Sequence, residues 1–473
     1  MFELFIHSPV KMSILIAFFV GSLVYVLMNI KNPKKLYYLT MFYIPLSFKS
    51  LSGSLVVYLI LFLYIFSLSH KEKINNFSTN ATDKILVGLI FLASLFSLTT
   101  ADINSIFYFS QGRVRLAPDF LDIITFLSCI AIYSMTKKYI RTREDLYRLI
   151  KLMVISASIA SLAGYLQIIN PENTYIFKYI VLGEDRLWAG RVAATMQGYE
   201  FLAEYTAIMI LLTLILIFHT RKPKIRYAYV ILIINFIIIL TLTQVRGIYI
   251  ALALTVVYMI FLMLALGRLK SSFKLILYST TAIFLLVASI LTIDAVKPDA
   301  GFVDRFTELK DLDISKGQYA TRTGAWEWAG QIISHMSTGE LLIGAGRKYL
   351  HTGKGDRMVS SWPHSLYLSY IMRDGYIGLF IFLIFLLWLY KQSLNSITRA
   401  KKMRDNKLFI IAIILNFILV LFIIDEAKIE FIRHDRSQNI TWLLFGIIVA
   451  FSLIVKNEYR TMRLKRQQSN KPT

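Results

Sequence analysis

The feature that most constrains this chain is a repeated series of apolar segments, each roughly 18–25 residues long, the length that a helix needs to cross a bilayer. Of the 473 residues, 56% are hydrophobic and only 17% are charged, which is too few charges for a soluble protein of this size. Only helices and closed barrels satisfy their backbone polar groups in lipid, and segments of this length fit helices. The sequence therefore predicts an all-α polytopic membrane protein.

Thirteen segments are candidate spans, although the second is short and is interrupted by Pro45 and Lys49, so we expect about 12–13 transmembrane helices. The first segment lacks a small-residue cleavage site, which predicts a retained span and not a removed signal peptide. The lone Cys129 lies in an apolar run, where it excludes an intramolecular disulfide and predicts a packing residue. The expected spans are 12–30, 36–50, 54–70, 84–100, 120–136, 149–168, 201–219, 226–244, 247–266, 273–293, 366–390, 408–424 and 439–456.

The loops on one side of these spans carry the basic residues. Their net charges total +25, against +23 for the whole chain, so that all other residues sum to −2. The positive-inside rule makes this side the cytoplasm, with the C-terminus inside and, for thirteen spans, the N-terminus outside. Short juxtamembrane clusters of this kind also argue against nucleic-acid binding. The basic loops are 31–35, 71–84, 137–151, 221–226, 268–274, 391–407 and 456–473.

Three parts follow from this topology: an N-terminal bundle of about ten spans at 1–293, a long extracytoplasmic loop at 294–365, and C-terminal spans with a basic tail at 366–473. The loop has nine acidic and nine basic side chains and is several times longer than a usual connection. Its tryptophans and apolar stretches argue against disorder. We expect a small, mainly helical cap there, with further outer segments at 101–119, 169–200 and 244–247.

Three arginines lie on the expected outer face. Arg246 stands between two spans, where a charge is costly unless it faces a polar cavity or an anion. Its fork of donors suits phosphate oxygens, although an arginine that reaches toward lipid headgroups would look the same. Arg191 and Arg322 are both close to glycines, and each alone fits an ordinary loop arginine. Together the three favour a phosphate-bearing lipid substrate.

His364 follows Trp362-Pro363 and begins the next expected helix. Histidine suits proton transfer near neutral pH, and a structural role at the membrane interface is the alternative. His335 and His351 lie in the same loop and compete with it, His351 less strongly because its surroundings look exposed.

Glu200 and Glu204 are four residues apart on one helical face, where they could orient an arginine, act as a base or form a local ion pair. Asp311-Leu312-Asp313 resembles a metal motif only in form, and no cluster of histidine or cysteine has ligand spacing. We expect neither a metal nor another cofactor. Arg373-Asp374-Gly375 is predicted to break the helix expected at 366–390.

Several short motifs on the outer side contain an arginine, a histidine or spaced glycines. They are Arg191-Val192-Ala193-Ala194-Thr195, Thr243-Gln244-Val245-Arg246-Gly247, Arg322 with Trp326, Gly344-x-Gly346, and His364-Ser365-x-Tyr367-Leu368 followed by Gly375-x-x-Gly378. In order and spacing, this set resembles the O-antigen ligase and O-antigen polymerase superfamily of bacterial surface-glycan assembly. The resemblance covers roughly residues 190–380. The chain departs from the family pattern at Ala194 (for Gly), at Ser365 (for Asn) and at Tyr199-Glu200 (for Asn-Pro or Asn-x).

The resemblance implies a GT-C-like, multi-pass protein of the bacterial cytoplasmic membrane that catalyses metal-independent glycosyl transfer on the outer side. The implied donor is an undecaprenyl-pyrophosphate-linked glycan, and the implied partners are an acceptor glycan or lipid, the lipid bilayer and a chain-length regulator, with no nucleic acid. Our hypothesis assigns Arg246 and Arg322 to the pyrophosphate and His364 to activation of the acceptor hydroxyl. Arg191 supports them, and the remaining substrate-binding residues are expected to be Glu200, Gly344, Gly346 and Tyr367.

The same motifs fit a polymerase of repeat units, a ligase that transfers glycan to lipid A core, and a protein O-oligosaccharyltransferase. A composition rich in Ile, Lys and Asn is typical of a low-GC genome and favours a bacterium without lipid A, and hence the polymerase. A flippase or transporter needs charged groups well inside the bundle, whereas the ionisable residues here crowd the outer ends of the spans. A purely structural subunit leaves the arginines unexplained.

Overall fold

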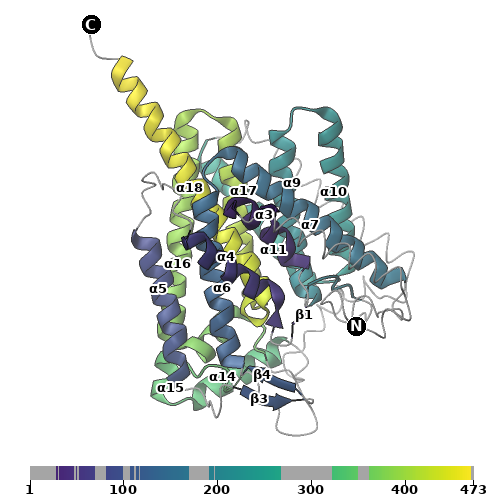
Figure 1. Ribbon diagram of the computed structural model, residues 1–473, viewed down its shortest axis with the longest axis vertical. Coiled ribbons are helices and arrows are strands. Elements are labelled where there is room, and N and C mark those ends of the chain that lie inside the picture. The colour runs from purple at the N-terminus through teal and green to yellow at the C-terminus, as the bar shows by residue number, and fades with distance from the viewer. Residues whose placement is uncertain are drawn as a thin grey trace.

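The structure is a computed structural model. It describes residues 28–29, 31–46, 49–50, 53–69, 81–99, 107–110, 113–116, 118–169, 191–196, 198–267, 322–349 and 362–469. Nearly all of these residues are helical (Figure 1).

Nine helices in the described part of the chain are long and apolar enough to cross a membrane, which confirms the predicted multi-pass membrane protein. Each coincides with a predicted span, whereas the spans expected at 12–30 and 273–293 lie outside the described residues. The nine helices are α5 (Ala81–Phe96, extended by the 3-10 turn Ser97–Thr99), α6 (Pro118–Tyr139), α7 (Arg143–Ile169), α9 (Tyr199–His219), α10 (Pro223–Leu242), α11 (Arg246–Ala265), α16 (Leu366–Met403), α17 (Asn406–Asp425) and α18 (Asp435–Ser469).

The span predicted at 36–50 is wrong in its extent. Helix α3 (Pro33–Tyr43) has 11 residues and is about 16 Å long, which is too short to cross the hydrocarbon core. It passes into a 3-10 turn at Ile44–Leu46, because Pro45 lacks the N–H that would continue the α-helical hydrogen bonds. A short hairpin of β1 (Lys49–Ser50) and β2 (Gly53–Ser54) then leads to α4 (Leu55–Ser69), which covers the span expected at 54–70 but is itself short.

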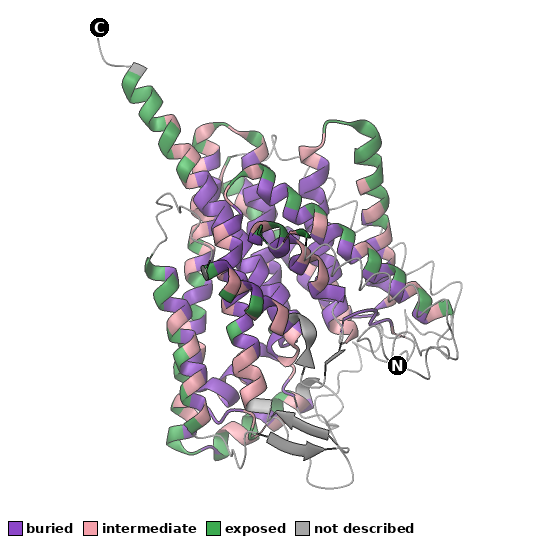
Figure 2. Ribbon diagram, viewed as in Figure 1, coloured by how far each residue is buried: buried purple, intermediate pink, exposed green. Residues whose placement is uncertain are grey.

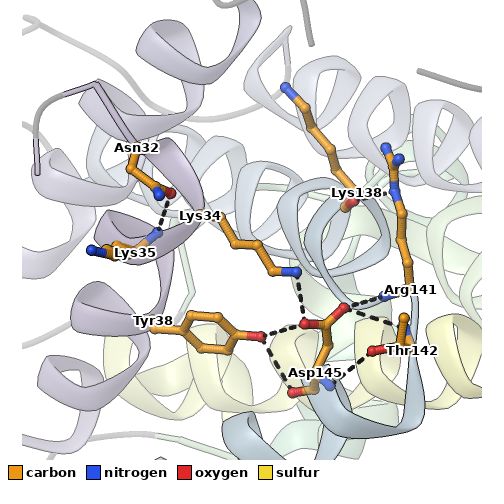
Figure 3. Close-up of polar contacts among 8 residues, drawn as sticks. All are labelled: Asn32, Lys34, Lys35, Tyr38, Lys138, Arg141, Thr142 and Asp145. Carbon is orange, nitrogen blue, oxygen red and sulfur yellow. Dashed lines mark hydrogen bonds and ion pairs between the residues drawn. The ribbon is translucent and has the colours of Figure 1, made fainter. Parts of the chain in front are cut away.

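The start of α3 is fixed to the start of α7 by one carboxylate (Figure 3). Asp145 forms an ion pair with Lys34 at 2.6 Å and accepts hydrogen bonds from the Tyr38 hydroxyl and from the backbone N–H groups of Arg141 and Thr142. The side chain of Asn32 caps α3 by accepting from a backbone N–H. These contacts place the basic residues of the 31–35 and 137–151 loops together at one end of the bundle.

The bundle has two distinct ends (Figure 1). The C-terminus and the α9–α10 and α16–α17 connections lie at one, which we name the C-terminal end. Helices α14 (Arg322–His335) and α15 (Thr338–Ile343) lie at the other, the cap end, beside a hairpin of β3 (Phe107–Ser110) and β4 (Arg113–Leu116). This hairpin is an addition to the helices that the sequence predicts.

The most buried spans are α9, α17 and α18, whose apolar windows are 94%, 78% and 100% buried. Figure 2 shows these buried residues running through the centre of the molecule, with exposed positions on the outer helices, as expected for spans that face lipid. Helix α18 begins inside the molecule, above α14 and α15 in the view of Figure 1. The α17–α18 connection therefore lies inside the molecule, between the cap and the rest of the bundle.

Helix α16 is broken at Gly375, as the sequence predicts. This glycine has φ 72° and ψ −178°, which separates Leu366–Asp374 from the long remainder of the helix. The segment after α15 docks against the break, because the N–H groups of Ala345 and Gly346 donate to the carbonyls of Met372 and Arg373, each at 3.0 Å. The cap is thereby joined to the bundle backbone to backbone.

Candidate functional site

The first two turns of α9 carry two acidic residues, Glu200 and Glu204. Gly198 is extended and precedes the helix without a side-chain cap, so the start of the helix keeps backbone N–H groups for other acceptors. Glu200 and Glu204 share one face, and Glu204 is only 5% exposed. A carboxylate buried this deeply in a membrane helix is costly and marks a position with a function.

His364 is paired with Glu200. Its Nδ1 lies 3.8 Å from Oε2 of that carboxylate. The residue has φ 48°, a left-handed conformation that is strained for a side chain of this size and that often occurs at functional positions. The backbone around it is fixed on both sides: the His364 carbonyl accepts from the Trp326 indole at 3.3 Å, and the Leu366 N–H donates to the Glu426 carbonyl at 2.9 Å.

Arg191 lies in a tight turn that points toward the start of α9. The Gln167 side chain accepts from the N–H of Ala194 at 2.9 Å and thus holds the turn on the end of α7. Ala194 has φ 47°, a backbone conformation that favours glycine. The guanidinium of Arg191 lies 4.6 Å from the ring centroid of Tyr199, and its Nε is buried with no acceptor among the described residues.

Arg246 begins α11 directly after a second tight turn, in which Gln244 has φ 54°. The two arginine-bearing turns are neighbours, because the N–H of Val192 donates to the carbonyl of Leu242 at 3.2 Å. The structure thus brings together the Arg191 and Arg246 turns, as the sequence hypothesis required.

A lysine that the sequence analysis did not select lies against the Arg246 turn. The side chain of Lys428 passes so close to Gly247 that a Cβ at that position would overlap it. Lys428 also forms an ion pair with Asp425 and interacts electrostatically with Glu204. It therefore connects the Arg246 turn with the acidic face of α9.

The α17–α18 connection is the part of the site that sequence reasoning missed. Eight of the twelve residues from Asp425 to Arg436 are ionisable, counting His434. Several of them are fully buried, including Glu426 and Glu430 at 0% exposure. The charge density of this run between two spans was a usable signal, but only the fold shows that it turns inward.

The electrostatics of this connection depart from those of a surface loop. Burial raises the pKa of the Glu426 carboxyl well above its usual range, and nearby Glu204 raises it further, although a hydrogen bond from the Phe431 N–H acts against this. Burial lowers the pKa of His434 well below its usual range, with Arg433 as the next cause, so the ring is neutral and packs edge-on against Phe201. The surroundings of Glu426 therefore favour the protonated form of its carboxyl.

The other predicted site residues take different places. Arg322 is the first residue of α14, and its side chain is outside the description; Trp326, one turn later on the same face, contacts His364. Tyr367 donates its hydroxyl hydrogen to the Ile423 carbonyl at 2.9 Å, which joins α16 to α17. Gly344 and Gly346 have φ 87° and 57° and pack on the break in α16. Their proposed substrate contacts stay predictions.

Of the competing histidines, His335 is exposed and its ring nitrogen is bonded to the Gln331 carbonyl within α14. His351 lies outside the described residues. No group of three or more histidine, cysteine or acidic residues in the described part of the chain is arranged to hold a metal ion. The site thus offers a histidine–carboxylate pair next to several cations, which suits proton transfer and the binding of an anion.

No protein-family model matches the sequence, and a search of curated proteins finds no match either.

Proposed function

We propose that this protein is a glycosyltransferase that polymerises oligosaccharide repeat units carried on undecaprenyl pyrophosphate, on the outer side of the bacterial cytoplasmic membrane. The observation that carries the proposal is the pairing of His364 with Glu200 at the start of α9, with Arg191 beside that helix start. Arg246 and Lys428 belong to the adjoining turns. A base beside a group of cations at a membrane surface fits transfer from a lipid pyrophosphate.

In the proposed reaction, an acceptor hydroxyl attacks the anomeric carbon of the donor. The bond between that carbon and the pyrophosphate oxygen breaks, and the electron pair leaves with the lipid pyrophosphate. Arg246, Lys428 and Arg322 stabilise the charge on this leaving group. His364 accepts the hydroxyl proton on Nε2, because Nδ1 lies 3.8 Å from Oε2 of Glu200 and would close to hydrogen-bond distance in this step, and the carboxylate stabilises the resulting imidazolium.

The polymerase is preferred to the ligase and to the protein O-oligosaccharyltransferase on the composition of the chain. These activities differ in their products. Loss of long chains with single repeats retained indicates a polymerase, whereas loss of attachment with long lipid-linked chains retained indicates a ligase or a protein glycosyltransferase.

The test is a glycan ladder from cells that express wild-type protein or single variants at equal levels. His364→Ala and Arg246→Ala are each expected to remove the long chains, because one loses the base and the other a pyrophosphate ligand. His335→Ala is the matched control, since this exposed histidine is the last residue of α14 and its ring is bonded to Gln331 within that helix. Unchanged ladders in both site variants would refute the assignment. Turnover of lipid-linked donor by purified protein without a gradient would separate the enzyme from a flippase.

A further inference from the structure

We infer that the C-terminal end of the molecule binds the headgroup of an anionic phospholipid, in a cavity between the ends of α16 and α18. The cavity has a volume of about 430 Å³. This is within the range of about 300–1,000 Å³ that is usual for small-molecule sites. Its lining residues are Lys402, Tyr459, Met462, Arg463, Arg466 and Gln467.

The lining has the charge that a phosphate requires. Three of the six residues, Lys402, Arg463 and Arg466, are cations, and none of the six is acidic. Two arginines offer forked donors, which suit phosphate oxygens better than a point charge does. A fourth cation is close by: Arg399 interacts electrostatically with Tyr459, and its Nη1 is buried with no acceptor among the described residues.

The carboxylates near these helix ends are bound by Arg143, which does not line the cavity. Asp405 and Glu458 are the acidic residues of the 391–407 and 456–473 segments. Both bind Arg143 at the start of α7, with Nη1 at 2.8 Å from Asp405 and Nε donating to Glu458 at 2.8 Å. This arrangement neutralises the two acids and leaves the cavity face of α18 basic.

The position of the cavity selects a lipid as the source of the phosphate. The buried part of α18 ends at Val455, and Tyr459 follows about 6 Å further along the helix axis, at headgroup depth. Beyond this point α18 projects from the bundle and is exposed (Figure 2). Tyr459 and Met462 add an aromatic ring and an apolar side chain, which suit the glycerol region of a phospholipid better than a free ion.

The test uses the full chain, purified in a neutral detergent and titrated with dioleoylphosphatidylglycerol or dioleoylphosphatidylcholine, with bound lipid counted by native mass spectrometry. We expect selective binding of phosphatidylglycerol and a loss of about 30-fold in its affinity in Arg463→Gln/Arg466→Gln. The matched control is Arg460→Gln/Lys465→Gln, which removes the same charge from exposed positions of α18 outside the cavity. The control is expected to bind phosphatidylglycerol as the wild type does.

Two results would overturn the inference. An equal loss in both double variants would mean that diffuse charge and not the cavity binds the lipid. Full competition by inorganic phosphate at millimolar concentration would mean that the cavity takes a free anion. Unfolding of each variant in the same detergent, monitored by circular dichroism, verifies that both remain folded.

Discussion

The two ends of this molecule differ in how far their charged side chains are exposed to solvent. At the C-terminal end the charged side chains are mostly basic and many are solvent-accessible. Ion pairs such as Arg143 with Glu458 are partly exposed there, although Asp83 is buried in its pair with Lys137. At the cap end, carboxylates and cations such as Glu204, Glu426 and Arg436 are buried within the bundle. Exposed basic residues are sufficient to set topology, whereas buried ones are unfavourable unless a function maintains them. The difference directs attention to the cap end as the place of chemistry.

The largest effect should come from the histidine–carboxylate pair. His364→Ala is expected to reduce turnover of the lipid-linked donor by about 10²–10⁴-fold, and Glu200→Gln by about tenfold. Because the two side chains act as one unit, the double variant should be no worse than His364→Ala alone. Turnover by purified protein measures this, with Glu327→Gln on the exposed face of α14 as the control. Additive losses would show that the pair does not act together.

A smaller effect is expected on stability from Lys428. Replacing it with Met leaves Asp425 and its buried neighbours without their cation, which should lower the free energy of unfolding by about 3–5 kcal/mol. Lys428→Met/Asp425→Asn should recover part of this loss. Denaturant unfolding in mild detergent measures both, and Lys391→Met, at an exposed position of α16, should change little. No difference between the Lys428 and Lys391 variants would mean that the cap end is as solvated as the other end.

The junction between cap and bundle should be sensitive to a single methyl group. At Gly344, φ is 87° and a Cβ would overlap the Arg373 carbonyl, so Gly344→Ala should destabilise the protein by about 3 kcal/mol. Gly339→Ala is the control, because this glycine has open space around it. Thermal unfolding in detergent compares the two. Equal melting temperatures would show that the junction accommodates the added methyl group without loss of stability.

The smallest effect should be found at the C-terminal end. Arg143→Gln breaks two partly exposed ion pairs and should cost only about 0.5–1 kcal/mol, since such pairs are screened by water and salt. The same denaturant experiment measures it. A loss as large as that of Lys428→Met would remove the contrast between the two ends.

Much of the fold could be predicted from the sequence, because apolar length and periodicity report directly on membrane spans. The nine described spans were predicted from apolar length, and the break at Gly375 was predicted from the Arg373-Asp374-Gly375 run. The span expected at 36–50 was wrong in its extent: its interruption by Pro45 was visible in the sequence, but apolar length alone still counted it as a span. The β3–β4 hairpin was not predicted either, because its short strands carry no periodic signal long enough to detect.

The candidate site was harder to predict than the spans. The neighbouring positions of the Arg191 and Arg246 turns agree with the placement expected from motif order, whereas the contact of His364 with Glu200 was not predicted. Lys428 could not be assigned, because a lysine next to a span usually lies at the surface and only packing shows it against Gly247. Gly344 and Gly346 were selected from the sequence, but their role was not. A spaced pair of glycines predicts that another group approaches the backbone closely, and it does not show whether that group is a ligand or another helix.

The docking of Gly344 and Gly346 on the break in α16 bears on how the cap can move. Backbone hydrogen bonds fasten this side of the cap to the bundle, so α15 moves only as a unit with the break in α16. Helix α14, in contrast, reaches His364 through the side chain of Trp326, a contact that a rotamer change can open. The α15 side of the cap is thus joined to the bundle through its backbone and the α14 side through a side chain, so α14 is the part of the cap that we expect to move more easily.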